Sequence, residues 1–317
     1  MQHKIEEAAL DAGFISAKPA TAHPFELWRK KLDELPLGKR MKMEHVPQAV
    51  SGWLVSESTA WAALYPAPPF SGWPEGHGQV SGYYIGSHEA RRRAGLWGKA
   101  VSELGYEVVV QPKLPARAIA IRACLGVHGL NGLLITPYGS FVYIAVLLVR
   151  SPPPEGAGGP GADISPGCGN CGKCIDACPA GAISENGVDA LACLSNSMYH
   201  QSSMPEGHYP QMGARVRGCD ECQLVCPCNA HVEHLAPNLT HTEPFALERL
   251  LAGPDLDAIG KLIGNNYAKK SKIQTQAVLA AANTGRKDFI PILRQHMDSD
   301  YEPLRKAAKW ALEELER

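Results

Sequence analysis

Residues 168–179 have the sequence CGNCGKCIDACP, and residues 219–227 have the sequence CDECQLVCP. In the first stretch, three thiolates at two-residue gaps can surround one face of an iron–sulfur cluster. The fourth cysteine, followed by proline, ligates the other cluster in two-cluster ferredoxins. Gly169 and Gly172 permit the tight path that this loop needs. The second stretch is the same motif with one cysteine missing, so the pair predicts a ferredoxin-like module that holds two [4Fe–4S] clusters.

Cys193 lies between the two stretches and is the obvious source of the missing thiolate. With crosswise ligation, all eight cysteines of the region are used. One cluster takes Cys168, Cys171, Cys174 and Cys226, and the other takes Cys178, Cys193, Cys219 and Cys222. Zinc is the main alternative for Cys-x2-Cys pairs, but paired zinc ribbons do not need the x3-Cys-Pro ending twice. Of the two remaining cysteines, Cys228 is expected to be a spare thiol and Cys124 a core residue of an apolar helix.

The 317 residues carry a formal net charge of −1, which argues against a strongly basic nucleic-acid binder and leaves a local basic patch open. The first residues contain no apolar stretch of the kind found in signal peptides. The longest apolar run, 141–149, is too short to cross a bilayer. We therefore expect a cytoplasmic protein without membrane contact, a reducing compartment in which disulfides are unusual and metal ligation is the ordinary use of clustered cysteines.

The pattern along the chain predicts an α+β protein with four parts. An α/β domain over 1–150 should contain strands near 50–55 and 107–110, helices over 88–104 and 115–124, and a hairpin of 133–135 with 141–149. A linker rich in proline and glycine follows over 151–164, and the cluster module occupies 165–235. A helical region over 236–317 resembles one HEAT-type repeat, with amphipathic segments at 273–282, 289–297 and 303–315. One repeat cannot bury its apolar face alone, so it should pack on the rest of the protein.

This order of parts resembles the epoxyqueuosine reductases. The resemblance extends to three stretches of sequence: RAIAIRACLG (117–126), LITPYGS (134–140) and GCDECQLVCP (218–227). These are cobalamin-dependent iron–sulfur enzymes of tRNA queuosine synthesis, related to the reductive dehalogenases. The resemblance implies cobalamin between the first domain and the cluster module. The positions that match the family's corrin-contacting segments are Tyr83, Asn131, Ser195 and Asp220. It further implies an external low-potential electron donor of flavodoxin or ferredoxin type, a tRNA partner, and a monomer.

The chain departs from the family where the substrate's proton donor is expected. The family carries an acidic residue just ahead of the segment that matches 112–117, whereas Val110 and Gln111 stand here. Neither side chain can supply a proton, so another residue would have to do so. The candidates are Tyr83, Tyr84, His88, Glu107 and His128, of which His128 and Tyr83 are singled out. Two alternatives to an epoxyqueuosine reductase therefore stay open. One is a divergent reductase of another small molecule, and the other is an electron-transfer or corrinoid-binding protein without substrate chemistry.

Overall fold

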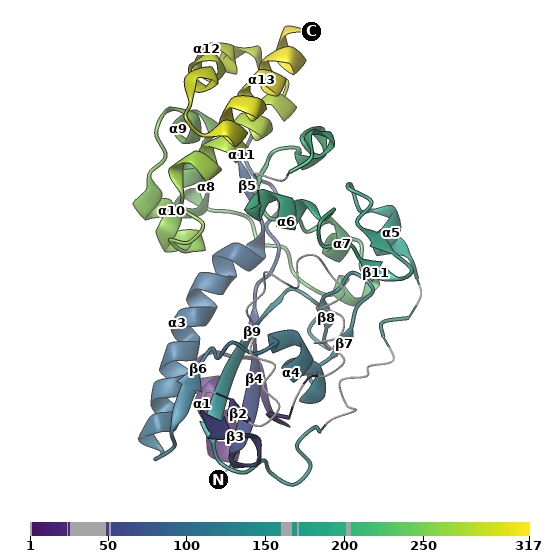
Figure 1. The fold of residues 1–317 in the computed structure, drawn as a ribbon, viewed down its shortest axis with the longest axis vertical. Coiled ribbons are helices and arrows are strands. Elements are labelled where there is room, and N and C mark those ends of the chain that lie inside the picture. Colours follow the sequence, from purple (N-terminus) through teal and green to yellow (C-terminus); the bar gives the residue numbers. More distant parts are fainter. Residues whose placement is uncertain are drawn as a thin grey trace.

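The computed structural model describes residues 2–23, 25, 49–50, 52–159, 167–169, 171–200 and 204–317. The fold is α+β, with the sheet at one end, the terminal helices at the other, and the cysteine segments beside the junction between them (Figure 1). The predicted strand at 50–55 is a short antiparallel pair of β2 (Ala49–Val50) and β3 (Trp53–Leu54), and Ser51 lies outside the described residues. Residues 160–164 of the predicted linker also lie outside them.

The first part is built on a four-stranded antiparallel sheet in the order β1-β4-β9-β6. Its strands are β1 (Ser16–Thr21), β4 (Ser58–Pro66), β6 (Val108–Val110) and β9 (Val142–Arg150). Long β4 and β9 form the centre, where Ala62 pairs with Val146. The predicted hairpin is wrong, because β8 (Leu134–Ile135) pairs with β7 (Val127–His128), and β9 pairs with strands that are distant in sequence.

Both faces of the sheet are buried, which explains why β4 and β9 are nearly continuous apolar runs. Even-numbered residues of both strands, such as Ala62 and Val146, face a core closed by α4 (Ala116–Arg122). Odd-numbered residues, such as Trp61 and Leu147, face a second core closed by α1 (Gln2–Asp11) and α3 (Gly82–Glu103).

The helix predicted over 115–124 ends at Arg122. Cys124 has a left-handed backbone (φ 53°) and is exposed, so the prediction that it lies in a core is wrong.

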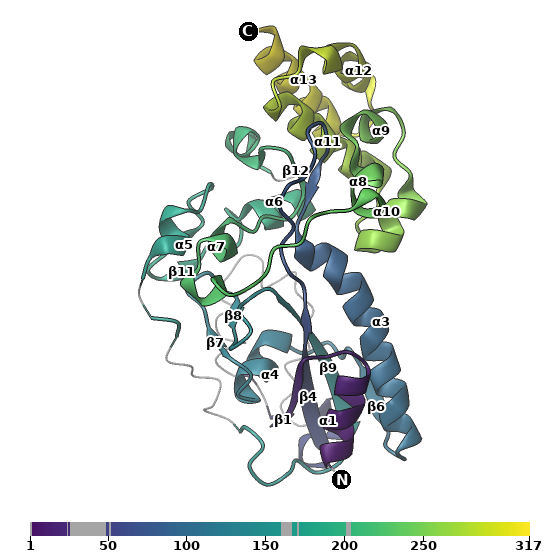
Figure 2. The ribbon, with the colours of Figure 1, turned by 180° about the vertical axis from the view of Figure 1, so that it is seen from behind.

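Helix α3 connects the two ends of the molecule, running from the sheet to the terminal helices in both views (Figure 2). The sequence predicted a helix from residue 88, and the structure begins it at Gly82 with Ser81 as N-cap, whose side chain accepts the backbone N–H of Tyr83. Side chains along one stripe, including Ala94, Trp97 and Val101, are buried against the sheet. The first turn lies beyond the sheet and reaches the cysteine segments.

The cysteine segments form short elements between loops. These are α5 (Lys173–Asp176), β10 (Ile183–Ser184), β11 (Gly187–Val188), α6 (Leu194–Tyr199), β12 (Arg215–Arg217) and α7 (Glu221–Leu224). Strand β12 pairs in parallel with β5 (Gln79–Val80), which immediately precedes α3. This pairing brings residues 217–222 against the first turn of α3.

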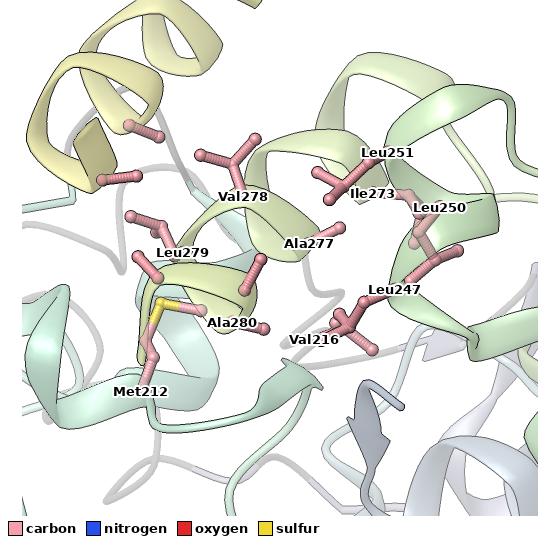
Figure 3. Close-up of a cluster of buried hydrophobic side chains, with 14 of the residues drawn as sticks. Met212, Val216, Leu247, Leu250, Leu251, Ile273, Ala277, Val278, Leu279 and Ala280 are labelled. Atoms are coloured by element: carbon pink, nitrogen blue, oxygen red, sulfur yellow. The ribbon is translucent and has the colours of Figure 1, made fainter. Parts of the chain in front are cut away.

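The chain ends in helices, as predicted, and they pack on the cysteine segments. They are α8 (Leu239–Thr242), α9 (Leu247–Ala252), α10 (Leu256–Ile263), α11 (Lys270–Asn283), α12 (Ile290–Gln295) and α13 (Glu302–Glu316). Residues 273–282 of α11 are all buried, since its neighbours cover it all round. Met212 and Val216 enter the same core as Leu247, Leu250 and Leu279 (Figure 3). The HEAT-like part therefore buries its apolar face against the cysteine segments.

Candidate functional site

The two cysteine runs fold into similar loop-and-helix turns that face each other. In the first run, Gly169 and Gly172 have left-handed backbones (φ 78° and 71°), and α5 follows directly. In the second run, left-handed Gly218 (φ 81°) precedes Cys219, and α7 follows. Helices α5 and α7 are in contact. The left-handed glycines allow the tight turns that each run makes before its helix.

Electrostatic coupling shows which thiols are neighbours across the two runs. The pKa of the Cys226 thiol is raised by burial and by the charges of Cys228 and Cys168. The pKa of the Cys222 thiol is raised to about 12 by burial and by the charges of Cys219, Cys193, Asp220 and Cys174. The second run thus lies against Cys168 at one end and against Cys193 at the other.

The buried thiols must lose their protons before they can bind a metal. Burial raises the pKa of Cys219 to about 11, so a bound metal must displace protons from these thiols to bind. Among the described residues, no three His, Cys, Asp or Glu side chains are close enough together to hold a single metal ion. The thiolates of an iron–sulfur cluster bind different irons and need not converge on one point.

A loop of the sheet domain lies on the cysteine runs. The backbone N–H of Leu130 donates to the Cys168 thiol at 3.4 Å. The Asn131 side chain, which is buried, donates to the carbonyl of Cys222 at 3.4 Å and accepts the N–H of Leu133. Asn131, predicted from sequence as a cofactor-binding position, is therefore located where the domain meets both runs.

Asp220 joins the second run to the start of α3. The Ser81 hydroxyl donates to Asp220 Oδ1 at 2.8 Å, and Gln223 Nε2 donates to the same oxygen at 3.1 Å. Burial raises the pKa of this carboxyl, while the bonds from Ser81 and Gln223 and the charge of Arg215 oppose the rise. Gln223 accepts the Ser140 hydroxyl in turn, so the bonded group extends into the sheet domain. In this structure Asp220 fixes the position of the module.

Tyrosines fill the same junction. The hydroxyls of Tyr84 and Ser195 lie 3.3 Å apart and share a hydrogen bond. The rings of Tyr83 and Tyr143 have centroids 5.9 Å apart. Tyr83 is 40% exposed, yet burial raises its pKa. Tyr83 therefore lies among other protein groups with part of its side chain open to solvent.

Two arginines accompany Tyr83, and sequence reasoning did not single them out. The charge of Arg91 acts to lower the pKa of Tyr83. The pKa of Arg117 is lowered by burial, an effect that the charge of Tyr83 opposes. The Arg91-Arg92-Arg93 run and Arg117 are visible in the sequence, but only the fold places Arg91 over the Tyr143 ring, 5.9 Å from its centroid, and brings both charges within range of Tyr83.

The four predicted cofactor positions thus lie along one junction: Tyr83 on α3, Ser195 against Tyr84, Asp220 against Ser81, and Asn131 against Cys222. His128, the other candidate proton donor, lies on exposed β7, on the stretch that leads to Asn131.

The two positions that replace the family's acid are engaged elsewhere. Val110 packs on α3, where a Cβ added at Gly98 would lie 2.3 Å from Val110 Cγ2. Gln111 has a left-handed backbone (φ 51°), and its side chain donates to the Tyr143 hydroxyl at 3.2 Å and accepts the N–H of Val146 at 3.4 Å. The strained conformation of Gln111 is therefore held by bonds to β9.

Comparison with known proteins agrees with the architecture. Residues 167–229 match the family model of a 4Fe-4S double cluster binding domain. The epoxyqueuosine reductase of Bacillus anthracis is 33% identical over 210 residues, which cover 63% of this chain and 54% of the relative. The matched part thus spans about half the length of that curated relative.

Solved structures extend the likeness to nearly the whole chain. One of them is an epoxyqueuosine reductase from Bacillus subtilis whose catalytic aspartate loop is swung out of the active site. It superposes with a TM-score of 0.79 at 24% identity, and the match covers 99% of this chain and 90% of that one. An epoxyqueuosine reductase bound to an epoxyqueuosine-modified tRNA stem loop gives a TM-score of 0.76 at 22% identity, with the same coverage. At these identities the likeness concerns the fold. No helix among the described residues is long and apolar enough to cross a membrane.

Proposed function

We propose that the chain is a member of the epoxyqueuosine reductase family and acts as a cobalamin-dependent iron–sulfur oxidoreductase. The observation that carries the proposal is the docking of a double-cluster module onto the sheet domain through Ser81–Asp220 and Asn131–Cys222. Electrons from an external low-potential donor of flavodoxin or ferredoxin type would pass through the module to this junction.

We assign one cluster to Cys168, Cys171, Cys174 and Cys226, and the other, called the Cys193 cluster below, to Cys178, Cys193, Cys219 and Cys222. The charge of Cys168 acts on the Cys226 thiol, and the charges of Cys219 and Cys193 act on the Cys222 thiol, which supports the crosswise assignment. The charge of Cys174, a ligand of the other cluster, also acts on Cys222, so the two clusters are expected to lie close together. Thiolate ligation and burial favour low reduction potentials, which electron delivery to a poorly reducible substrate requires.

The assignment predicts that Cys193→Ala loses one cluster and keeps the other at least in part, because only one cluster loses a ligand. Iron and acid-labile sulfide should fall to about half in anaerobically purified protein. Cys124→Ala is the matched control, since this exposed thiol is outside both ligand sets, and it should keep the full content. Full iron content in the Cys193→Ala protein would contradict the assignment.

Cobalamin is proposed to lie at the junction, held by Tyr83, Asn131, Ser195 and Asp220. Bound there, it would supply low-valent cobalt as the reductant. The hydrogen bonds that join the sheet domain and the start of α3 to the module, near partly exposed Tyr83, support this placement. Ser195 and Asn131 would contribute hydroxyl and amide groups suited to the polar rim of such a ligand.

For the proton donor we favour Tyr83 over His128. A donor must lie at the proposed cofactor site, and Tyr83 does so on the first turn of α3. Burial raises the pKa of Tyr83 and so opposes proton release, whereas the charge of Arg91 lowers this pKa and favours release. Arg91 and Arg117 lie where they would stabilise the phenolate after transfer. His128 lies on β7, away from the hydrogen bonds Ser81–Asp220 and Tyr84–Ser195 that surround the first turn of α3.

The proposed substrate is epoxyqueuosine in a tRNA, since a relative binds such a stem loop. In this chain, several cations of the terminal helices are paired with carboxylates, including Arg294 with Glu316 and Lys306 with Glu302. The lysines at the start of α11 (Lys269, Lys270 and Lys272) lie closer to the junction and are the better candidates for phosphate contacts.

One observation favours a different small molecule as substrate. Val110 and Gln111 replace the family's acid, and both side chains are engaged with α3 or β9. A site that has lost this acid could serve a substrate with other proton requirements.

An anaerobic assay with a strong reductant, cobalamin and epoxyqueuosine-containing RNA separates the possibilities. We expect the wild-type protein to turn over the substrate. Tyr83→Phe should abolish this turnover, and His128→Gln should preserve it. Corrin uptake without turnover would favour the other substrate. Absence of corrin uptake would leave an electron-transfer protein.

A further inference from the structure

Arg217 is a buried cation that has no counter-ion among the described residues. The residue is 4% exposed, and no carboxylate of the described chain forms an ion pair with it. Within the described part of the chain, its side chain makes one hydrogen bond, from Nη1 to the carbonyl of Met198 at 3.4 Å, while Nε and Nη2 are buried and have no partner there. Leaving a guanidinium in this state costs several kcal/mol, so the position calls for an explanation.

Three tyrosine rings surround the guanidinium of Arg217. The carbon Cζ lies 4.2 Å from the ring centroid of Tyr267, 4.6 Å from that of Tyr84 and 5.6 Å from that of Tyr199. Cation–π contacts stabilise the ion and keep it in place. The rings are neutral, however, so the positive charge is not cancelled and its field extends into the surrounding protein.

The same residues border the Cys193 cluster. Arg217 is two residues from Cys219, and the intervening Gly218 packs so closely that an added Cβ would lie 2.8 Å from the Tyr84 ring. The hydroxyl of Tyr84 bonds to Ser195, two residues after Cys193. Tyr84 is therefore influenced by the charge of Arg217 on one side and by that of Cys193 on the other. Met198, which accepts the bond from Arg217, lies on α6, the helix that Cys193 caps.

We propose that Arg217 is a potential-tuning residue that makes the Cys193 cluster easier to reduce. A four-thiolate cluster is an anion and gains a further negative charge when it takes an electron. A fixed cation in a poorly polarisable interior stabilises the reduced state more than the oxidised state. Arginine suits this role because it stays protonated. The inference rests on the proposed cluster ligands and is independent of substrate and cobalamin.

The test is an anaerobic redox titration followed by electron paramagnetic resonance, with iron and sulfide measured for every variant. The signal of the Cys193 cluster is the one that Cys193→Ala removes. Arg217→Met should make this cluster about tenfold harder to reduce, a fall of about 59 mV for one electron, and leave the other cluster nearly unchanged. Arg217→Lys, which keeps the charge, should stay near the wild-type potential.

Lys272→Met is the matched control. Lys272 also stacks on Tyr199, at 5.3 Å, but it is only partly buried, so water screens its charge and the shift should be smaller. If both cluster potentials were unchanged in a fully loaded Arg217→Met protein, the proposal would be overturned. It would also be overturned if the potential of the Cys193 cluster fell as far in Arg217→Lys as in Arg217→Met. Loss of both clusters in Arg217→Met and in Arg217→Gln would make the role structural and would also overturn it.

Discussion

Gly218 is the residue at which the cysteine module meets the first turn of α3. Its backbone is left-handed (φ 81°), and a Cβ there would lie 2.6 Å from Ser81 Cβ. Gly218→Ala should therefore lower the free energy of unfolding by about 1–3 kcal/mol or more, through overpacking and backbone strain together. Chemical denaturation of the cluster-loaded protein measures the change.

Gly207→Ala is the control for Gly218→Ala. No heavy atom lies within 4 Å of a Cβ added at Gly207, and its backbone is not left-handed. This variant should stay within about 0.5 kcal/mol of the wild type. Equal stability of the two variants would show that the junction tolerates an added methyl group.

His208 makes stability depend on pH. The residue is buried, its ring bonds to the Ser197 hydroxyl at 3.0 Å, and burial lowers its pKa from 6.5. Below about pH 6.5, the unfolded chain therefore binds a proton at His208 more readily than the folded chain does. The free energy of unfolding should fall as the pH drops below this value. His208→Gln should flatten this part of a stability-against-pH curve, whereas Ser197→Ala, which keeps the histidine, should retain the slope.

At the scale of elements, Ser81 connects a helix to the module. Its hydroxyl caps α3 by accepting the N–H of Tyr83, and it donates to Asp220. Ser81→Ala removes a cap worth about 1 kcal/mol and a bond to a charged group worth about 1.5–3 kcal/mol. Ser87→Ala, on the same helix, loses only a bond to the carbonyl of Tyr84 and should cost at most about 1.5 kcal/mol in thermal or chemical unfolding. Similar losses in both variants would argue against a special role for Ser81.

Local patterns in the sequence predicted some elements well and others poorly. The apolar stripe of Ala94, Trp97 and Val101 predicted α3, because a helix that packs on one face repeats every 3.6 residues. Its first turn was missed, since Gly82 and Gly86 weaken the helical pattern there. The hairpin was wrong because β9 pairs with β4 across about 80 residues, and nothing local specifies such a partner.

The functional site likewise combines features that the sequence predicted with features that it did not. Cysteine spacing is local and predicted the double-cluster module that the family match confirms. The bond between Ser81 and Asp220 joins residues 139 positions apart, and the tyrosines around Arg217 come from α3, α6 and the loop before α11. The left-handed backbone of Gln111 has no signal in its residue type. Such features follow from packing and could be found only in the folded chain.

At the scale of the whole molecule, the cysteine module and the terminal helices share one core. Met212 and Val216 from the module pack with Leu250 and Leu279 from the helices (Figure 3). Neither part can expose this surface without a large loss of buried apolar area. We therefore expect the two parts to unfold together, with cluster absorbance and helical circular dichroism lost at the same denaturant concentration.

Leu279→Ala tests this coupling. The side chain is fully buried, so the substitution should cost about 2–5 kcal/mol and move both transitions down equally, although Leu279 lies far along the chain from every cysteine. Leu239→Ala, at a position that is 76% exposed, should move neither. If helical signal were lost while cluster absorbance persisted, the helices would be a separate folding unit. In that case the shared core would not be needed to hold the cysteine loops in place.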